Sequence, residues 1–117
     1  MSANVTVSVR EIQTPPALIF EITGTMDSSK DLEYIASVIE SSDKELFLLS
    51  MSGVDYINSA GVGEIISISH SVKEAGKKLC FAGMHPYVRG VFELLGGHYF
   101  VPVYDSEAEA LAAQGQQ

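Results

Sequence analysis

One short segment of this chain places a hydroxyl group where a strand is expected to give way to a helix. The segment reads Asn58-Ser59-Ala60-Gly61-Val62-Gly63. An apolar run at residues 45–51 precedes it, and apolar residues follow it at helical spacing, namely Val62, Ile65, Ile66 and Val72. A serine at a helix start can cap free backbone N–H groups. It can also carry a phosphate, which the helix dipole and the unpaired amides favour. On these local features alone, the cap is the favoured interpretation of Ser59.

The first third of the chain predicts two strands and a helix. Val5, Val7 and Val9 alternate with polar residues, and residues 17–22 form a second β-like run after a double proline, so we expect a strand pair. A helix should follow, with Asp27-Ser28-Ser29 as its capping cluster and residues 41–43 as its end. Its apolar face comprises Leu32, Ile35, Ala36 and Ile39.

Strands and helices continue to alternate in the middle of the chain. A strand over residues 45–51 leads through a loop to a helix that starts at Ser59 and runs to about Glu74. The Ala75-Gly76 pair should stop this helix before a strand over residues 79–82. This order of elements requires helical crossovers between parallel strands.

The last third of the chain predicts a helix, a strand and a second short helix. Pro86 suits the first turn of a helix that Gly96-Gly97 ends. Residues 99–103 are expected to form a final strand, in which Pro102 indicates the edge of the sheet. Ser106 and Glu109 form a capping-box pattern ahead of the last helix. The polar tail from about residue 114 should fray.

Length and composition indicate one small domain. The chain has 117 residues, of which 46% are hydrophobic, enough for one core and too few for two ordinary domains. Repeated strand-helix-strand units imply parallel pairing with helices packed on the sheet, and the initial strand pair makes that sheet mixed. The expected fold class is α/β, a single domain over residues 1–117 with a mixed sheet and about four helices.

The charge of the chain favours some partners over others. A net charge of −8 argues against nucleic acid, because binding to phosphate backbones depends on lysine and arginine. A basic partner is expected instead. The few basic residues form no long run along the sequence, and no stretch is apolar enough to span a bilayer, so we expect no membrane insertion. The polar start does not resemble a signal peptide, which favours a cytoplasmic location.

Histidine and cysteine do not form an evident reactive or metal-binding site in the sequence. His70, His85 and His98 lack the close spacing and neighbouring ligands of a metal site, so we expect no bound metal. Cys80 is the single cysteine, and its apolar neighbours are typical of a small strand residue. Ordinary structural roles are therefore expected for all four.

Nucleotide binding and hydrolase chemistry also lack their usual signatures. Gly61 and Gly63 are not part of a Gly-x-x-x-x-Gly-Lys-Ser/Thr loop, so we expect no nucleotide and no other cofactor. A serine-hydrolase elbow around Ser59 would need glycine where Ile57 stands. We therefore expect that the protein is not an enzyme.

Three motifs, in order along the chain, resemble the STAS domain. They are Gly24-Thr25-Met26-Asp27, the segment around Ser59, and a helix with Pro86, Val88 and Phe92. More narrowly, they resemble the bacterial anti-sigma factor antagonists, whose members carry a Gly-Glu-Leu-Asp-like turn, an Asp-Ser-Ser/Thr-Gly-Leu-Gly-like switch loop and a Pro-x-Val-x-x-x-Phe-like helix. The resemblance covers nearly the whole chain.

This resemblance implies a phosphorylation switch. In such antagonists, the serine that matches Ser59 is phosphorylated by a partner serine kinase, which is also an anti-sigma factor, and a phosphatase reverses the reaction. The unphosphorylated form binds the anti-sigma factor and so releases a sigma factor. The motif positions implied in partner binding are Asp27, Asn58, Ser59, Ala60, Gly61 and Val62.

The chain departs from the family motifs at three positions. Asn58 stands where aspartate is common, Thr25 replaces the glutamate of the first turn, and Ala60 leaves Ser59 as the one hydroxyl of the switch loop. Two other functions remain open. One is an unphosphorylated STAS adaptor of a signalling scaffold or a lipid-transport ATPase, in which Ser59 merely caps the helix. The other is a small-molecule-binding α/β domain, which would need a polar pocket that the sequence does not reveal.

Overall fold

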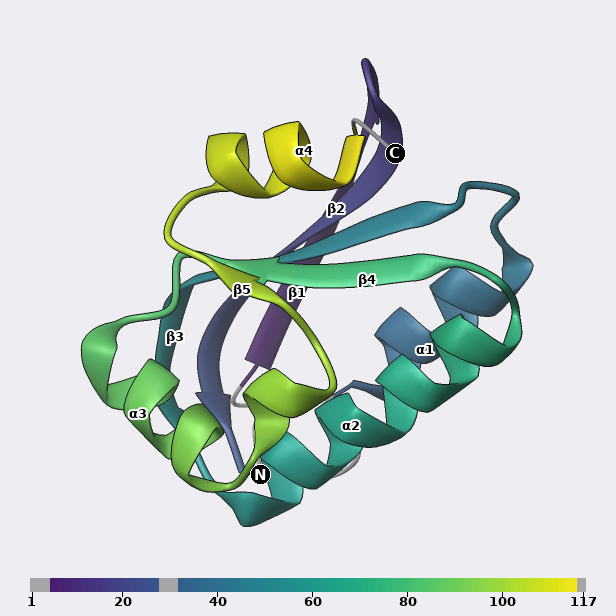
Figure 1. Cartoon of the computed structure of the whole chain (residues 1–117). Helices are drawn as coiled ribbons and strands as arrows, with labels where there is room; N and C mark the ends of the chain where they lie inside the picture. Colours follow the sequence, from purple (N-terminus) through teal and green to yellow (C-terminus); the bar gives the residue numbers. More distant parts are fainter. Residues whose placement is uncertain (1–4, 28–31, 116–117) are drawn as a thin grey trace.

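A five-stranded sheet in the order β1-β2-β3-β4-β5 organises the molecule, in a computed structural model that describes residues 5–27 and 32–115 (Figure 1). Along the chain, the elements are β1 (Val5–Gln13), β2 (Pro16–Met26), α1 (Glu33–Ser41), β3 (Leu46–Ile57), α2 (Ser59–Glu74), β4 (Lys78–Ala82), α3 (Pro86–Leu94), the 3₁₀ turn η1 (Gly97–Tyr99), β5 (Val103–Tyr104) and α4 (Glu107–Gly115).

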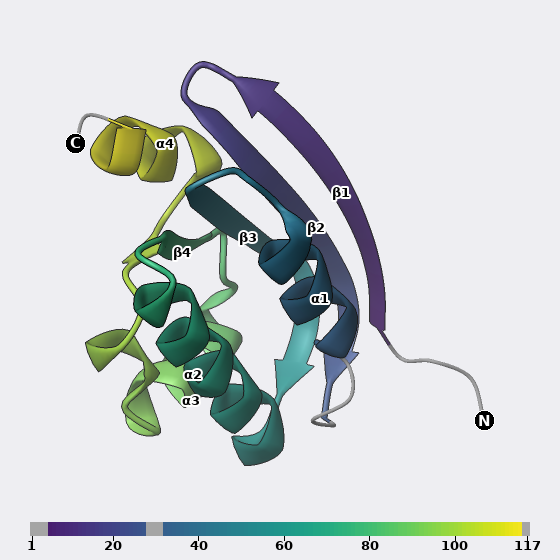
Figure 2. The ribbon, with the colours of Figure 1, turned by 90° about the vertical axis from the view of Figure 1, so that its right-hand side faces the viewer.

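The sheet is mixed, as the sequence predicts. β1 and β2 are antiparallel, whereas β2, β3, β4 and β5 run parallel to their neighbours. The packing partners of the helices place α1, α2 and α3 on one face and α4 on the other (Figures 1 and 2). The predicted α/β fold class is therefore confirmed.

Alternating side chains of the central strands supply two hydrophobic clusters. In β2, Phe20 and Ile22 point into the larger cluster, which also contains the buried residues of α1, α2 and α3. Ala17 and Ile19 point to the opposite face and pack with Ala110 of α4. This period of two is the geometry of a strand buried on both sides. The sheet thereby fixes α2 firmly against β3 and β4.

Several predicted ends of helices are confirmed. α2 ends at Glu74, and Gly76 follows with a left-handed φ of 76°. Pro86 occupies the first turn of α3. The Ser106 hydroxyl accepts a hydrogen bond from the N–H of Glu109 at 3.1 Å, which caps α4 as the sequence pattern indicates.

The predicted last strand is wrong in its bounds. Residues 97–99 form a 3₁₀ turn, and β5 comprises only Val103–Tyr104. Gly97 packs so closely under Phe92 that an added Cβ would lie 2.4 Å from the ring, and Gly96 before it adopts φ 81°. These two glycines turn the chain back over α3 before a strand can start. β5 does lie at the edge of the sheet, as Pro102 indicated.

Three other boundaries differ from the prediction. β3 continues past residue 51 to Ile57, since Val54 and Ile57 still face the core. α1 begins at Glu33 after Leu32, which makes no side-chain cap bond; of the predicted capping cluster, Ser28 and Ser29 lie outside the described residues. α4 extends through Gly115, so the helix includes the first two residues of the predicted polar tail. In the described ranges, no helix is long and apolar enough to cross a membrane.

Candidate functional site

The candidate site lies where β2, β3 and α2 meet. β2 and β3 are parallel and end together, with Met26 paired to Ile57 in the last register position. α2 begins two residues later at Ser59. The backbone N–H of Asn58 donates to the carbonyl of Met26 at 3.3 Å, which ties the start of the helix to the end of β2. In Figure 1 this junction is the lower end of α2.

Asn58, not Ser59, caps α2. Its Oδ1 accepts a hydrogen bond from the N–H of Gly61 at 3.0 Å, and its backbone is extended, with φ −125° and ψ −174°. Its Nδ2 also donates to the carbonyl of Asp27 at 3.4 Å. The cap assigned to Ser59 from local sequence is therefore wrong. Asparagine and serine cap helices about equally well, so the backbone conformation decides which of them is the cap. Asn58 has the extended conformation of an N-cap residue.

Ser59 is left as an exposed hydroxyl on the first residue of the helix. Its side chain is exposed, and among the described residues its hydroxyl makes no hydrogen bond with another protein group. Unpaired N–H groups and the positive end of the helix dipole lie beside it. The position is open to an enzyme that modifies hydroxyls, and negative charge is tolerated there.

Gly61 holds the helix start close to the strand ends. A Cβ at this position would lie 2.7 Å from the carbonyl oxygen of Met26 and 3.0 Å from Cγ1 of Ile57. Val62 next to it is buried, at 2% exposure. Both residues were expected at the partner-binding face, and the structure places them beneath it. They shape the surface from below, because they expose little to a partner.

The remaining predicted positions reach the surface. Asp27 and Ala60 are exposed like Ser59, and Asn58 is half-buried. The fold therefore brings all six predicted residues to one junction, in two layers. Exposed side chains at Asp27, Ser59 and Ala60 form the outer layer over a base of Asn58, Gly61 and Val62.

The surroundings of this junction are acidic. Burial raises the pKa of Glu64, in the second turn of α2, and the nearby Glu33 carboxylate raises it further. Thr25, at the position where relatives of the motif carry glutamate, donates through Oγ1 to Oδ1 of Asp55 at 3.2 Å. Residues 59–64 contain no lysine or arginine. A phosphate on Ser59 would add charge to a surface that is already negative.

Two tyrosines beside the junction were not identified from the sequence. The rings of Tyr56, near the end of β3, and Tyr87, in the first turn of α3, stack with centroids 6.3 Å apart. They are 39% and 56% exposed. Tyr56 is paired in register with Thr25. No local pattern reveals this pair, because the two residues are brought together only by the parallel crossover through β4.

The other side chains considered for chemistry have structural surroundings. Cys80 is buried, and burial raises the pKa of its thiol to about 12, so it stays protonated at neutral pH. His70 packs edge-on to Phe100, with ring centroids 5.6 Å apart. Across residues 5–27 and 32–115, no group of His, Cys, Asp and Glu side chains is arranged to hold a metal ion.

Comparison with known proteins identifies the family of this fold. The family model of the STAS domain matches residues 7–110. The chain belongs to the STAS domain family. The candidate anti-sigma factor antagonist BtrV of Bordetella bronchiseptica is 29% identical over 98 residues, which are 82% of this chain and 84% of that protein. The anti-sigma F factor antagonist of Paenibacillus polymyxa is 24% identical over 97 residues, covering 80% and 83%.

Solved structures share the fold of this STAS domain. The anti-sigma factor antagonist SpoIIAA in its unphosphorylated form superposes with a TM-score of 0.68 at 12% identity, covering 95% of this chain and 98% of that one. The phosphorylated form of the same Bacillus protein gives 0.67 at 14% identity, covering 93% and 99%. This STAS domain is thus about equally similar to both forms.

Proposed function

We propose that this STAS domain is an anti-sigma factor antagonist switched by phosphorylation of Ser59. In the unphosphorylated form it binds an anti-sigma factor that is also a serine kinase, and a sigma factor is released for transcription. Phosphorylation of Ser59 by that kinase cancels the binding, and a serine phosphatase restores it. The protein acts in the cytoplasm as a regulatory binding protein and carries out no catalysis itself.

The capping role of Asn58 is the observation that carries this proposal. If Ser59 capped α2, its hydroxyl would be committed to a backbone N–H, and the residue would have a sufficient structural explanation. Asn58 accepts the bond from Gly61 instead. Ser59 is then a polar, exposed residue that makes no cap bond within the described part of the chain, at the position that matches the phosphoacceptor of the antagonists that the chain resembles.

The surroundings of Ser59 provide a physical basis for the switch. A phosphate adds about −1.5 to −2 charges and three acceptor oxygens. On a partner surface that receives a small neutral hydroxyl, this charge must be desolvated without a counter-ion, which opposes binding. Within the domain, the helix start favours negative charge. Phosphorylation can therefore remove the interface and leave the fold intact.

The two layers of the junction have different parts in this proposal. Asp27 and Ala60 contact the partner together with Ser59, because they are exposed beside it. Gly61 and Val62 set how closely the start of α2 approaches the ends of β2 and β3. The stacked pair of Tyr56 and Tyr87 extends the docking face, since exposed tyrosines contribute strongly to protein interfaces.

Intact mass after incubation with a cognate kinase and ATP tests the proposal. We expect one added phosphate on the wild type and none on Ser59→Ala. The matched control is Ser67→Ala, which removes another exposed hydroxyl of α2 and should leave phosphorylation unchanged. Equal modification of Ser59→Ala would exclude Ser59 as the acceptor. Tight binding to the partner without any phosphorylation would favour the adaptor function.

A further inference from the structure

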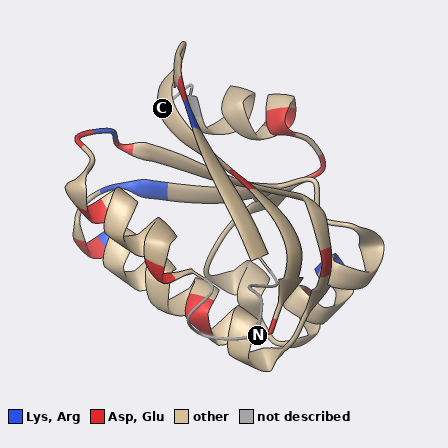
Figure 3. Ribbon diagram, turned by 180° about the vertical axis from the view of Figure 1, so that it is seen from behind, with Lys and Arg blue, Asp and Glu red and all other residues tan. Residues whose placement is uncertain are grey.

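The opposite end of α2 forms a pocket with a very different charge. A cavity of about 320 Å³ lies between the last turns of α2, the start of β4, the segment before β5 and the end of α4. Three lysines line it, Lys73, Lys77 and Lys78. No acidic residue does, although the chain carries a net charge of −8. In Figure 3 the start of β4 is blue.

The ammonium groups of these lysines are not equally available. Nζ of Lys77 donates to the carbonyl of Ser42 at 2.7 Å and lies 5.5 Å from the centroid of the Phe47 ring. Neither Ser42 nor Phe47 lines the pocket, so the Lys77 ammonium group is already engaged outside it. Lys73 and Lys78 are exposed, and neither forms an ion pair among the described residues. Two exposed ammonium groups without an ion-pair partner among those residues are therefore available to a ligand.

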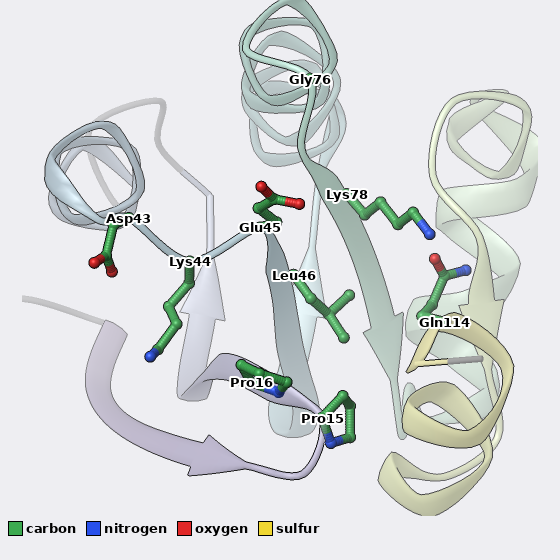
Figure 4. Close-up of a pocket in the computed structure, with 9 residues that line it drawn as sticks. All are labelled: Pro15, Pro16, Asp43, Lys44, Glu45, Leu46, Gly76, Lys78 and Gln114. Carbon is green, nitrogen blue, oxygen red and sulfur yellow. The ribbon is translucent and has the colours of Figure 1, made fainter. Parts of the chain in front are cut away.

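The adjoining pocket shows that this charge is not general to this end of the molecule. A cavity of about 400 Å³ shares Lys78 and Gln114 with it (Figure 4). Its lining contains two lysines, Lys44 and Lys78, and two carboxylates, Asp43 and Glu45. Lys44 also forms an ion pair with Glu11 at 2.9 Å. The larger pocket is thus balanced in charge, and the smaller one is not.

The other walls of the lysine pocket are partly apolar. Leu79, Phe100 and Pro102 contribute a hydrophobic side. Ser69 is a buried polar residue, 2% exposed, and its hydroxyl donates to the carbonyl of Ile66 at 2.8 Å. Gln114 is held by the hydroxyl of Tyr104 at 2.8 Å and lies beside Lys78 (Figure 4). A few polar groups around an apolar wall are typical of small-molecule sites.

We propose that this pocket binds a small organic acid, with one phosphate or carboxylate head placed between Lys73 and Lys78 and a compact apolar body against Leu79, Phe100 and Pro102. The volume is at the lower end of that of ligand sites and fits a molecule of this size. Lys73 lies fourteen residues after Ser59, or about 21 Å along the helix. The site is therefore separate from the phosphorylation switch and does not depend on it.

Chemical-shift titration of the full chain with phenyl phosphate tests the proposal. We expect saturable shifts at residues 69–73, 78–79 and 100–102. Benzyl alcohol, which lacks the charge, should bind at least about tenfold more weakly, the difference that one charge-assisted contact provides. Inorganic phosphate, which lacks the apolar body, should also bind at least about tenfold more weakly, because it buries no ring against the apolar wall. Absent or non-saturable shifts, or equal binding of all three probes, would overturn the proposal.

Lysine variants locate the site. Lys73→Gln with Lys78→Gln should weaken phenyl phosphate at least about tenfold, and the folded spectrum of the variant shows that the loss is local. The control, Lys44→Gln, removes one positive charge from the adjoining pocket, where Lys44 is half-buried and paired with Glu11. It should change affinity less than about twofold, because this charge lies outside the site. Equal losses in both variants, or binding only to phosphatidylglycerol vesicles, would exclude a small-molecule site here.

Discussion

The two ends of α2 differ in the kind of contact that surrounds them. At the Ser59 end, backbone contacts decide the geometry: an asparagine cap, a glycine pressed on a carbonyl, and a strand end bonded to the helix start. At the other end, long lysine side chains surround a cavity. The first end is rigid and surrounded by acidic groups. The second carries one pocket lined by lysines without an acidic residue, beside a pocket that is balanced in charge.

This difference shows that the net charge of a sequence does not reveal how the fold distributes charged side chains over the molecule. The net charge of −8 agrees with the acidic surroundings of the Ser59 end but not with the lysine pocket at the other end. A rigid end suits a protein partner whose binding must respond to one phosphate. A surface that cannot adjust loses much of its affinity when a single side chain is modified. An end with mobile cations around an apolar wall suits a small anion. Variants at the rigid end should therefore produce larger effects than those at the flexible end.

The largest expected effect is the loss of partner binding in Ser59→Asp. The carboxylate introduces a charge into the docking face, and we expect the affinity for the kinase to fall about a hundredfold, since an uncompensated charge at an interface costs several kcal/mol. The free energy of unfolding should change by less than about 0.5 kcal/mol, as at exposed positions. Titration calorimetry and urea unfolding measure the two quantities.

Ser67→Asp is the control for that experiment. It places the same charge on an exposed position two turns along α2, outside the junction. The kinase should bind it as it binds the wild type. If both aspartate variants lose the same affinity, the effect comes from overall charge, and the Ser59 end is not a specific docking face.

The next effect is on stability and concerns two glycines that lie two residues apart. An added Cβ at Gly61 would meet the backbone of Met26 at 2.7 Å, whereas at Gly63 it would meet nothing within 4 Å. We expect Gly61→Ala to destabilise the domain by about 2–3 kcal/mol through overpacking. Gly63→Ala should stabilise it by about 0.5–1 kcal/mol through helix propensity. Urea unfolding that gives both variants the same sign would contradict the rigid packing of this end.

Much of the fold was predictable, because it depends on patterns of residues that are close together in the sequence. The apolar spacing of α1 and α2, Pro86 at the start of α3, and Ser106 with Glu109 at α4 each act over a few residues. β3 was predicted too short because the continuous apolar run ends at residue 51. In the structure, Gly53 is required where β3 crosses Thr23, since a Cβ would lie 2.5 Å from the methyl group of that threonine.

The sites were only partly predictable, because they depend on contacts between distant segments. Ser59 was identified as the key residue, yet local features assigned the cap of α2 to it and not to Asn58. Asn58 makes the cap bond to Gly61 and also donates to the carbonyl of Asp27, which is distant in the sequence. The basic residues form no long run in the sequence. Lys73, Lys77 and Lys78 lie close together in the sequence, but the pocket that they line is completed by Phe100, Pro102 and Gln114 from a distant segment.

A smaller effect concerns the rate of phosphorylation in Asn58→Asp. The new carboxylate still accepts the bond from Gly61, and it can orient the Ser59 hydroxyl or pair with a basic kinase residue. A charge-assisted bond contributes roughly 1.5–3 kcal/mol, and repulsion of the incoming phosphoryl group offsets part of this. We expect a rate increase of up to about tenfold, equivalent to about 1.4 kcal/mol. A slower single-turnover rate would show that the kinase is adapted to the amide.

The smallest effect tests whether Asn58 alone serves as the cap. Asn58→Ala removes the acceptor for the Gly61 N–H and should cost about 1 kcal/mol of unfolding free energy. Asn58→Ser restores an acceptor but not the donor to Asp27, so it should recover most of that loss. If Asn58→Ala costs nothing in urea unfolding, the Ser59 hydroxyl has turned back to cap the helix. The double variant Asn58→Ala/Ser59→Ala would then lose more than the two single variants together. Such coupling would give Ser59 a structural task and would remove the observation on which its assignment as the switch depends.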